Sequence, residues 1–553
     1  MRGWAYAGLL ALAGCYEGVS ENAGDSDLGD APSSDGSGNS EETGDEGPSA
    51  VDCDAPQPGP TPIRRLSRRE LDNTLRDLLG PDAALASSML PPDVQPRIFD
   101  TDVGSHGITE ELAFAYMHLA EAVAEQATSD VQALVGCDPA DGRACARSFA
   151  EDLCPRAWRR PCDADEIDAL VDVWATADDF TDGTQRMLAV ILQSADFLYR
   201  PEIGDASAEQ DGVVPLDSWE VASRLSYFLW GSMPDDALFA AAEEDALRDA
   251  DAIAEQVDRM LADPRAEAQT VWFHEQWLGI TAIEDVAKDP ALFPGFDTAR
   301  IAMREEAARF VVSVVLDGGS LRDLLTSRTS FVNDELAAFY GLQAPGSDEL
   351  TRVELPADRH AGILTKGALL SIGGNQASSS PVRRGVTVLR QVMCGEPPPP
   401  PPDVDGSVPA PTPDTTTRER FEAHVSDPSC AACHNMFDPI GFAFEHFDAA
   451  GRWRDEDNGF PVDASGDLVG TDVDGPFDGA VELAAKLADS EQVHACYIDH
   501  VFAFAAGRIA DEDADACTLD GLESEFTASG GSLTDLLVAY TRSDSFRYRR
   551  RDP

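Results

Sequence analysis

Residues 63–80 read IRRLSRRELDNTLRDLLG, which is the pattern of an amphipathic helix. The apolar residues recur at intervals of three and four, which places them on one helical face: Leu71, Leu75, Leu78 and Leu79. Ser67 and Glu70 have the spacing of a capping box, and Leu66 can pack onto Leu71 as a hydrophobic staple. Gly80 is placed to end the helix. The stretch therefore predicts a helix whose two ends are both marked.

The same pattern continues along the chain. Residues 216–236, LDSWEVASRLSYFLWGSMPDD, predict a helix that begins after Asp217 and ends at Gly231 and Pro234. Comparable stripes occupy residues 108–127, 143–157, 164–176, 183–198, 249–262, 265–279, 298–316, 332–340, 478–488, 491–507 and 532–542. Strand signals are few, and the best is a small hairpin near FPVDASGDLVG at residues 460–470. The fold class is therefore mainly α, a multi-domain helical body with few short strands.

Composition excludes one class of function. The chain has 553 residues, with 41 Lys and Arg against 101 Asp and Glu, and its formal net charge is −60. Such a surface repels the phosphates of nucleic acids, so no nucleic-acid partner is expected.

The N-terminus has the features of a bacterial lipoprotein signal. A charged start is followed by an apolar run and by small residues before Cys15, so residues 1–15 form the predicted signal peptide and lipobox. Acylation of Cys15 would anchor the protein to a membrane outside the cytoplasm, and Tyr16 after it favours the outer membrane or cell surface over the inner membrane. The alternative is a plain secretory signal. Residues 16–60 are acidic and poor in apolar residues, which predicts a disordered tether.

Linkers divide the chain beyond the tether. Six consecutive prolines from Pro397 favour a stiff polyproline II spacer, with a recognition ligand for another protein as the alternative. We expect helical domains at residues 61–128, 137–203, 215–345, 358–456 and 477–550. The second of these has several cysteines, and the fourth contains the proline linker and a cysteine motif.

The cysteine count fits an exported protein. Of eleven cysteines, Cys15 belongs to the signal and two belong to the motif at residues 430–434, and the remaining eight are an even number that suits disulfides. Spacing alone does not choose the pairing, and short local links are expected: Cys137–Cys145, Cys154–Cys162 and Cys496–Cys517.

The motif Cys430-Ala-Ala-Cys433-His434 is the strongest sequence signal for a cofactor site. In an exported protein this CxxCH spacing is the attachment signature of haem c, where two thiols bond the porphyrin and the histidine ligates iron on the proximal side. A dithiol, a zinc site and coincidence are the alternatives, but no βαβ pattern and no second ligand pair accompany the cysteines. A backbone carbonyl near Asp438 and Pro439 is expected to accept from the other ring nitrogen of His434.

Apolar residues crowd the positions just after the histidine, and they can cover a porphyrin face or form ordinary core: Phe437, Ile440, Phe442, Phe444 and Phe447. The distal iron ligand stays open between His424, Met393 and His500, and the sequence also offers His446, Met436 and His494. A five-coordinate iron with an open distal position is a further possibility.

Several segments together resemble a known family. These are RRLSRRELDNTLRDLLG, RAWRRPCDADEIDALVDVW, EVASRLSYFLWGSMPDD, GILTKGALLSIGGNQASSSPVRRG, DPSCAACHNMFDPIGFAFEHFDAAGRWR and LTDLLVAYTRSDSFRYR. They are similar to the secreted cytochrome-like proteins of planctomycetes and myxobacteria, which are built from domains of unknown function 1587, 1595, 1592, 1588 and 1585. The resemblance implies haem binding through the CxxCH at Cys430, Cys433 and His434, and it implies no established reaction.

The sequence therefore predicts a lipid-anchored, extracytoplasmic protein with one covalent haem c. It would act in electron transfer or as an oxidoreductase of unknown substrate, with a redox protein as partner. One alternative is a cell-surface helical scaffold or binding lipoprotein in which haem is structural or absent. Another is a haem peroxidase with an open distal site.

Overall fold

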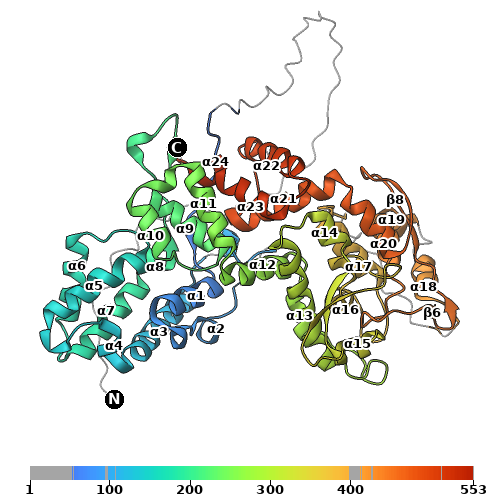
Figure 1. The fold of residues 1–553 in the computed structure, drawn as a ribbon, viewed down its shortest axis with the longest axis horizontal. Helices are drawn as coiled ribbons and strands as arrows, with labels where there is room; N and C mark the ends of the chain where they lie inside the picture. The colour runs from blue at the N-terminus through green and yellow to red at the C-terminus, as the bar shows by residue number, and fades with distance from the viewer. Residues whose placement is uncertain are drawn as a thin grey trace, which may run out of the picture. The chain divides into compact units, whose positions relative to one another are not determined.

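A computed structural model describes residues 53, 55–93, 98–105, 107–397, 412, 414–424, 428–511 and 513–551 (Figure 1). Within these ranges the side chains of residues 105, 423, 424, 428–430, 432 and 433 are not described. The described part is mainly helical, as the sequence predicts. Over the same ranges, no helix combines the length and apolar character that crossing a bilayer requires. The predicted signal, Cys15 and almost all of the tether lie outside the described residues.

The first helices pack around a core of their own. They are α1 (Arg68–Leu79), α2 (Ala86–Met89), α3 (Glu110–Ala127), α4 (Val131–Val135), α5 (Arg143–Trp158), α6 (Ala164–Trp174), α7 (Phe180–Gln193) and α8 (Ala195–Leu198). Helix α7 contacts both α3 and α6, and α6 also contacts α5. Leu71, Val123, Ala150 and Ile191 lie fully buried in this core, so the apolar stripes of separate helices meet there.

A second and larger core joins the rest of the chain. It takes residues from α9 (Ser218–Leu229), α10 (Asp236–Glu243), α11 (Ala250–Leu261), α12 (Pro264–Trp277), α13 (Phe296–Val315), α14 (Leu321–Thr326), α15 (Asp334–Tyr340), α16 (Gly367–Ile372), the π-helix η9 (Val388–Val392), α19 (Pro428–Phe442), α20 (Gly479–Ala488), α21 (Glu491–Ala506), α22 (Ala516–Ala528), α23 (Leu533–Arg542) and α24 (Asp544–Arg547). The partly buried Val382 and Val386 of α17 (Pro381–Thr387) pack against it, and α18 is Thr417–His424. Helix α23 lies beside α11, although far from it in sequence (Figure 1). The described residues between 53 and 551 accordingly form one compact unit.

The helix ends confirm the predicted caps. Ser67 and Glu70 form the capping box of α1, and Gly80 follows it with a φ of 98°. Asp217 caps α9 in the same way, with Glu220 as its partner in the box. These side chains satisfy backbone N–H groups that have no acceptor inside the helix.

The strands form five antiparallel pairs in the described part of the chain. They are β1 (Arg64–Arg65) with β2 (Tyr199–Arg200), β3 (Val213–Pro215) with β10 (Tyr548–Arg550), β4 (Thr329–Val332) with β5 (Thr351–Glu354), β6 (Glu456–Asp457) with β7 (Phe460–Pro461), and β8 (Ser465–Leu468) with β9 (Gly475–Asp478). The expected hairpin at residues 460–470 is therefore wrong in its pairing. Its two halves, β7 and β8, each pair with a strand outside that stretch.

All eight remaining cysteines form disulfides, and two of the three expected pairs are confirmed. These are Cys137–Cys145 and Cys154–Cys162, each closing a short loop. The expected Cys496–Cys517 pair is wrong, because Cys496 bonds Cys394 and Cys517 bonds Cys53. Their partners are brought near by packing of segments 102 and 464 residues apart, which sequence spacing does not reveal.

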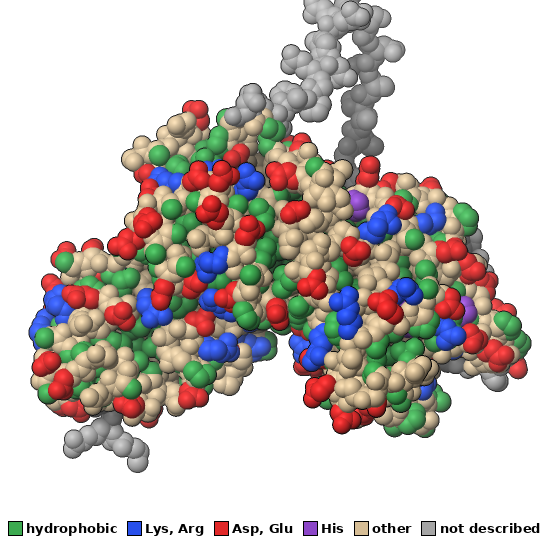
Figure 2. Space-filling model, in the orientation of Figure 1, with side chains coloured by type: hydrophobic (Ala, Val, Ile, Leu, Met, Phe, Trp, Pro, Cys, Tyr) green, Lys and Arg blue, Asp and Glu red, His purple; other side chains and the backbone are tan. Residues whose placement is uncertain are grey.

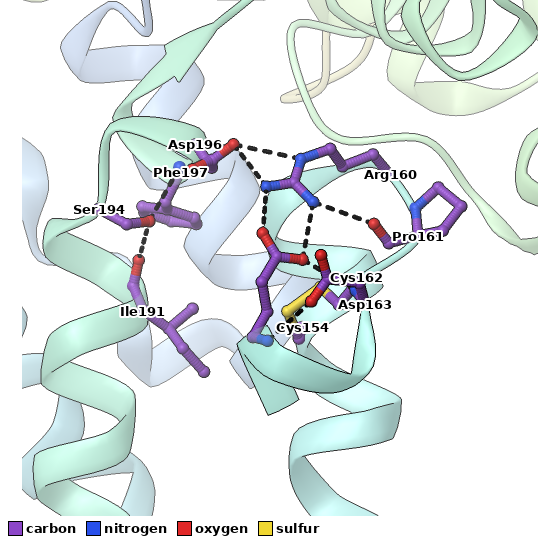
Figure 3. The surroundings of a disulfide bond; sticks show 10 residues. Cys154, Arg160, Pro161, Cys162, Asp163, Ile191, Ser194, Asp196 and Phe197 are labelled. Atoms are coloured by element: carbon purple, nitrogen blue, oxygen red, sulfur yellow. Dashed lines mark hydrogen bonds and ion pairs between the residues drawn. A yellow bond between two sulfur atoms is a disulfide. The ribbon is translucent and has the colours of Figure 1, made fainter. Parts of the chain in front are cut away.

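The Cys154–Cys162 loop shows how such a link is supported (Figure 3). Arg160, inside the loop, donates to Glu166 at 2.8 Å and to Asp196 at 2.9 Å. Glu166 also belongs to the capping box of α6 with Asp163. The disulfide, the helix cap and the ion pairs therefore fix the same turn.

Candidate functional site

The CxxCH motif lies within helix α19. Positions 433 and 434 follow position 430 by three and four residues, so the backbone places both on the same face of the helix as position 430. The side chains of Cys430 and Cys433 lie outside the described residues, as does that of His424 at the end of α18. Among the predicted haem-attachment residues, His434 is the one whose side chain is described.

A buried carboxylate holds the imidazole of His434. Nδ1 of His434 is 2.9 Å from Oδ2 of Asp438, one helical turn further on. The Asp438 side chain is 4% exposed and the His434 side chain 19% exposed. The Phe437 ring lies 4.9 Å from the imidazole, measured between centroids. Asp438 therefore supplies, with its side chain, the contact that the sequence suggested for a backbone carbonyl.

Helix α19 crosses helix α17 closely. A Cβ atom at Gly385 would clash with the carbonyl oxygen of Phe437, and one at Gly441 would clash with that of Pro381. The two glycines therefore allow the backbones to touch. This contact sets where α19 lies within the second core.

The apolar residues after the motif are buried, which agrees with a packing role. Phe437, Ile440, Phe444 and Phe447 lie in the second core, and the Phe442 ring lies under the Arg418 guanidinium, 4.6 Å from its centroid. Whether any of them also covers a porphyrin stays a prediction.

Buried charged residues hold the segment after α19 in place through hydrogen bonds. Arg384 donates to the carbonyl oxygens of Phe444 at 2.8 Å and Phe447 at 2.7 Å. Burial lowers the pKa of Arg384 to about 10, and burial raises the pKa of Glu445. Glu445 accepts from Ser379 and Arg454, both at 2.8 Å. These residues join α17 to the end of the motif segment.

Sequence reasoning missed this network, although one of its charged residues, Glu445, stands within the apolar run of the quoted segment AFEHFDAAGRWR. A charge within an apolar run is a signal for a buried pair.

The distal ligand candidates lie in different surroundings. Met393 is buried directly after η9, and η9 contacts both α19 and α21. His500, on α21, has Nε2 2.9 Å from the carbonyl oxygen of Gln391. His424 ends α18. The choice between these three stays a prediction.

The structure also describes the surroundings of the other three possible distal ligands. His446 stacks on Trp453 with ring centroids 4.5 Å apart, and its Nδ1 is 2.9 Å from a backbone carbonyl. His494 has Nε2 3.2 Å from the carbonyl oxygen of Ala488, and Met436 is exposed on α19. Each therefore has surroundings that explain it without a metal.

The described part of the donor set, His434 with Asp438, fits the proximal side of a haem c. A carboxylate at Nδ1 fixes the ring orientation of a ligating histidine, and the nitrogen that faces the metal is then Nε2. His434 and Asp438 have this arrangement, on the helix that carries both motif cysteines. Cys430 and Cys433 would hold the porphyrin, and His434 would hold its iron.

The fold and the site define a class: mainly helical proteins in which a histidine of a cysteine motif contacts a buried carboxylate. Five families, each described as a protein of unknown function, match the chain in order: DUF1587 at residues 64–129, DUF1595 at 145–202, DUF1592 at 216–342, DUF1588 at 360–457 and DUF1585 at 474–546. The chain belongs to the family of proteins built from these five domains in this order. No curated protein and no solved structure matches it.

Proposed function

We propose that this protein is an extracytoplasmic, lipid-anchored haem c protein that acts in electron transfer or as an oxidoreductase of unknown substrate. The observation that carries the proposal is the contact between His434 Nδ1 and the buried Asp438 carboxylate, within the helix of the CxxCH motif. The matching region at residues 360–457, which contains the motif, belongs to the family with the short name PSCyt3. That name agrees with a cytochrome-like role.

Each residue of the site has a defined part. Cys430 and Cys433 would anchor the porphyrin through thioether bonds, and His434 would bind iron through Nε2. Asp438 orients the imidazole and raises its basicity. The bound haem supplies a one-electron couple between ferric and ferrous iron.

The same contact favours peroxidase activity as a second candidate. A carboxylate on the proximal histidine makes it a stronger electron donor to the metal. His434, made more basic by Asp438, would then hold an iron suited to peroxide chemistry if the site is open on its other side. The distal position therefore decides between a carrier and a catalyst.

Charge indicates the kind of redox partner. Acidic side chains are spread over the face seen in Figure 2, and the whole chain carries a formal charge of −60. A cationic partner would be steered toward such a surface. We expect its association rate to fall steeply as salt is added.

The anchor part of the proposal concerns Cys15. Mature protein should enter the detergent phase of a detergent partition, and a Cys15→Ser variant should stay in the aqueous phase. Wild-type protein that stays in the aqueous phase contradicts the lipid anchor and leaves the haem proposal intact.

A haem stain after denaturation tests the central claim. Protein made together with the haem-attachment machinery should be coloured, stain on a denaturing gel and carry the added mass of one haem. The double variant Cys430→Ala, Cys433→Ala should lose the stain, whereas the matched variant Cys137→Ala, Cys145→Ala should keep it. A colourless wild-type protein refutes the proposal and supports a scaffold or binding role.

The ferrous spectrum then separates the two haem functions. A closed six-coordinate carrier shows no change with carbon monoxide. An open site binds carbon monoxide and shifts the Soret band, which supports peroxidase activity.

A further inference from the structure

The disulfide between Cys394 and Cys496 has an imidazole beside it. Nε2 of His500 lies 3.5 Å from Sγ of Cys496 and 3.7 Å from Sγ of Cys394. The two sulfur atoms and a ring nitrogen of His500 all lie within 4.8 Å of one another. Residues from two segments 102 positions apart therefore meet at one point.

The surrounding backbone holds this imidazole in place. The Gln391 carbonyl oxygen, in the π-helix η9, lies 2.9 Å from His500 Nε2 and accepts from Trp277 Nε1 at 2.6 Å. A carbonyl can only accept, so Nε2 is the protonated nitrogen of His500. The same N–H group lies within reach of both sulfurs. Burial lowers the pKa of His500 to about 4, so the ring is neutral at neutral pH.

The two cysteines differ in access. Cys394 is exposed and lies in the left-handed region with a φ of 51°, a strained conformation for a residue with a side chain. Cys496 is 1% exposed. Cys394 and His500 both line a cavity of about 340 Å³, with Phe99 and Ile509 among its apolar walls. An incoming thiol can therefore reach Cys394, and Cys496 is the buried partner.

We propose that Cys394–Cys496 is a redox-active disulfide that exchanges with a dithiol partner, with His500 as the hydrogen-bond donor beside it. A thiolate of the partner attacks Cys394 Sγ, so a mixed disulfide forms and the Cys394–Cys496 bond breaks. The electron pair of that bond leaves on Cys496 Sγ, which accepts a hydrogen bond from His500 Nε2–H.

The second thiolate of the partner then attacks the mixed disulfide and releases Cys394. The partner is oxidised to a disulfide. This protein takes up two electrons and two protons, and both cysteines become thiols. The loop opened in this way contains α18 and α19, so reduction removes a covalent closure around the candidate haem segment.

Differential alkylation of the folded, full-length protein tests the proposal. The protein is incubated with dithiothreitol, quenched with N-ethylmaleimide and mapped by peptide mass spectrometry, with an unreduced sample as the baseline. Cys394 and Cys496 should be labelled before the other three disulfides. A His500→Leu variant should react about tenfold more slowly, because a hydrogen bond to the leaving thiolate is lost.

His274→Leu is the matched control, since His274 is also buried and its pKa is also lowered to about 4 by burial. His274 contacts Tyr497 and the Thr270 carbonyl oxygen, so its loss should leave the rate unchanged. Labelling of Cys53 and Cys517 first would overturn the proposal, and the wild-type protein alone decides this. Equal rates in the two histidine variants would remove His500 from the step.

Discussion

Asp438→Asn is the sharpest test of the histidine–carboxylate pair. The substitution keeps the size of the side chain and removes its negative charge, 2.9 Å from His434 Nδ1. Because Asp438 is buried, water does not replace the lost charge. A hydrogen bond to a charged group contributes about 1.5–3 kcal/mol. If all of it favours ferric over ferrous iron, the reduction potential rises by about 60–130 mV, at about 59 mV per tenfold change for one electron.

The assay is a spectroscopic redox titration of the haem-loaded protein. Asp467→Asn makes the same change of charge on an exposed residue of β8, so it controls for the long-range effect of net charge. The reasoning holds if Asp438→Asn raises the potential by tens of millivolts and Asp467→Asn changes it by much less. It is refuted if the two variants shift the potential equally while both retain their haem.

Three further predictions concern folding. Gly385→Ala forces a Cβ against backbone and should lower the free energy of unfolding by about 1–3 kcal/mol in urea, whereas Gly521→Ala in open space should not lower it. Ser67→Ala removes a cap and should cost about 0.5–2 kcal/mol in the same measurement, and an unchanged midpoint would contradict this. Burial lowers the pKa values of His274 and His360 to about 4, below their unfolded values near 6.5. The unfolded state therefore binds more protons between these values, so stability should fall as pH drops from 6.5 to 4, by about 1.4 kcal/mol per pH unit for each group. Unfolding curves of a His274→Gln variant should show a shallower fall.

Much of the fold could be predicted because its signals are local. A helix joins residues four apart, so its apolar stripe and its caps can be recognised in a short window, as Ser67 and Glu70 show. The two short disulfide loops depend on the same local spacing. The hairpin at residues 460–470 failed because a strand does not specify its partner, and β7 and β8 each found another.

The candidate site also has a local part, which the sequence predicts, and a long-range part, which it does not. The motif positions on α19 follow from the sequence, and the one-turn spacing of His434 and Asp438 is equally local, although the sequence prediction assigned that contact to a backbone carbonyl. Arg384 and Glu445 are 61 positions apart, and only packing brings them together. Their spacing carried no signal.

The sequence by itself determined the helical class, the helix ends, the cysteine motif and the acidic charge. Each of these depends on composition or on residues within one or two helical turns. Only the tertiary structure decided that the described helices share two cores, that Cys496 bonds Cys394, and that His500 lies against that disulfide. Contacts between residues a hundred positions apart depend on how whole helices pack. The local sequence around such a residue does not reveal which distant residue it will contact.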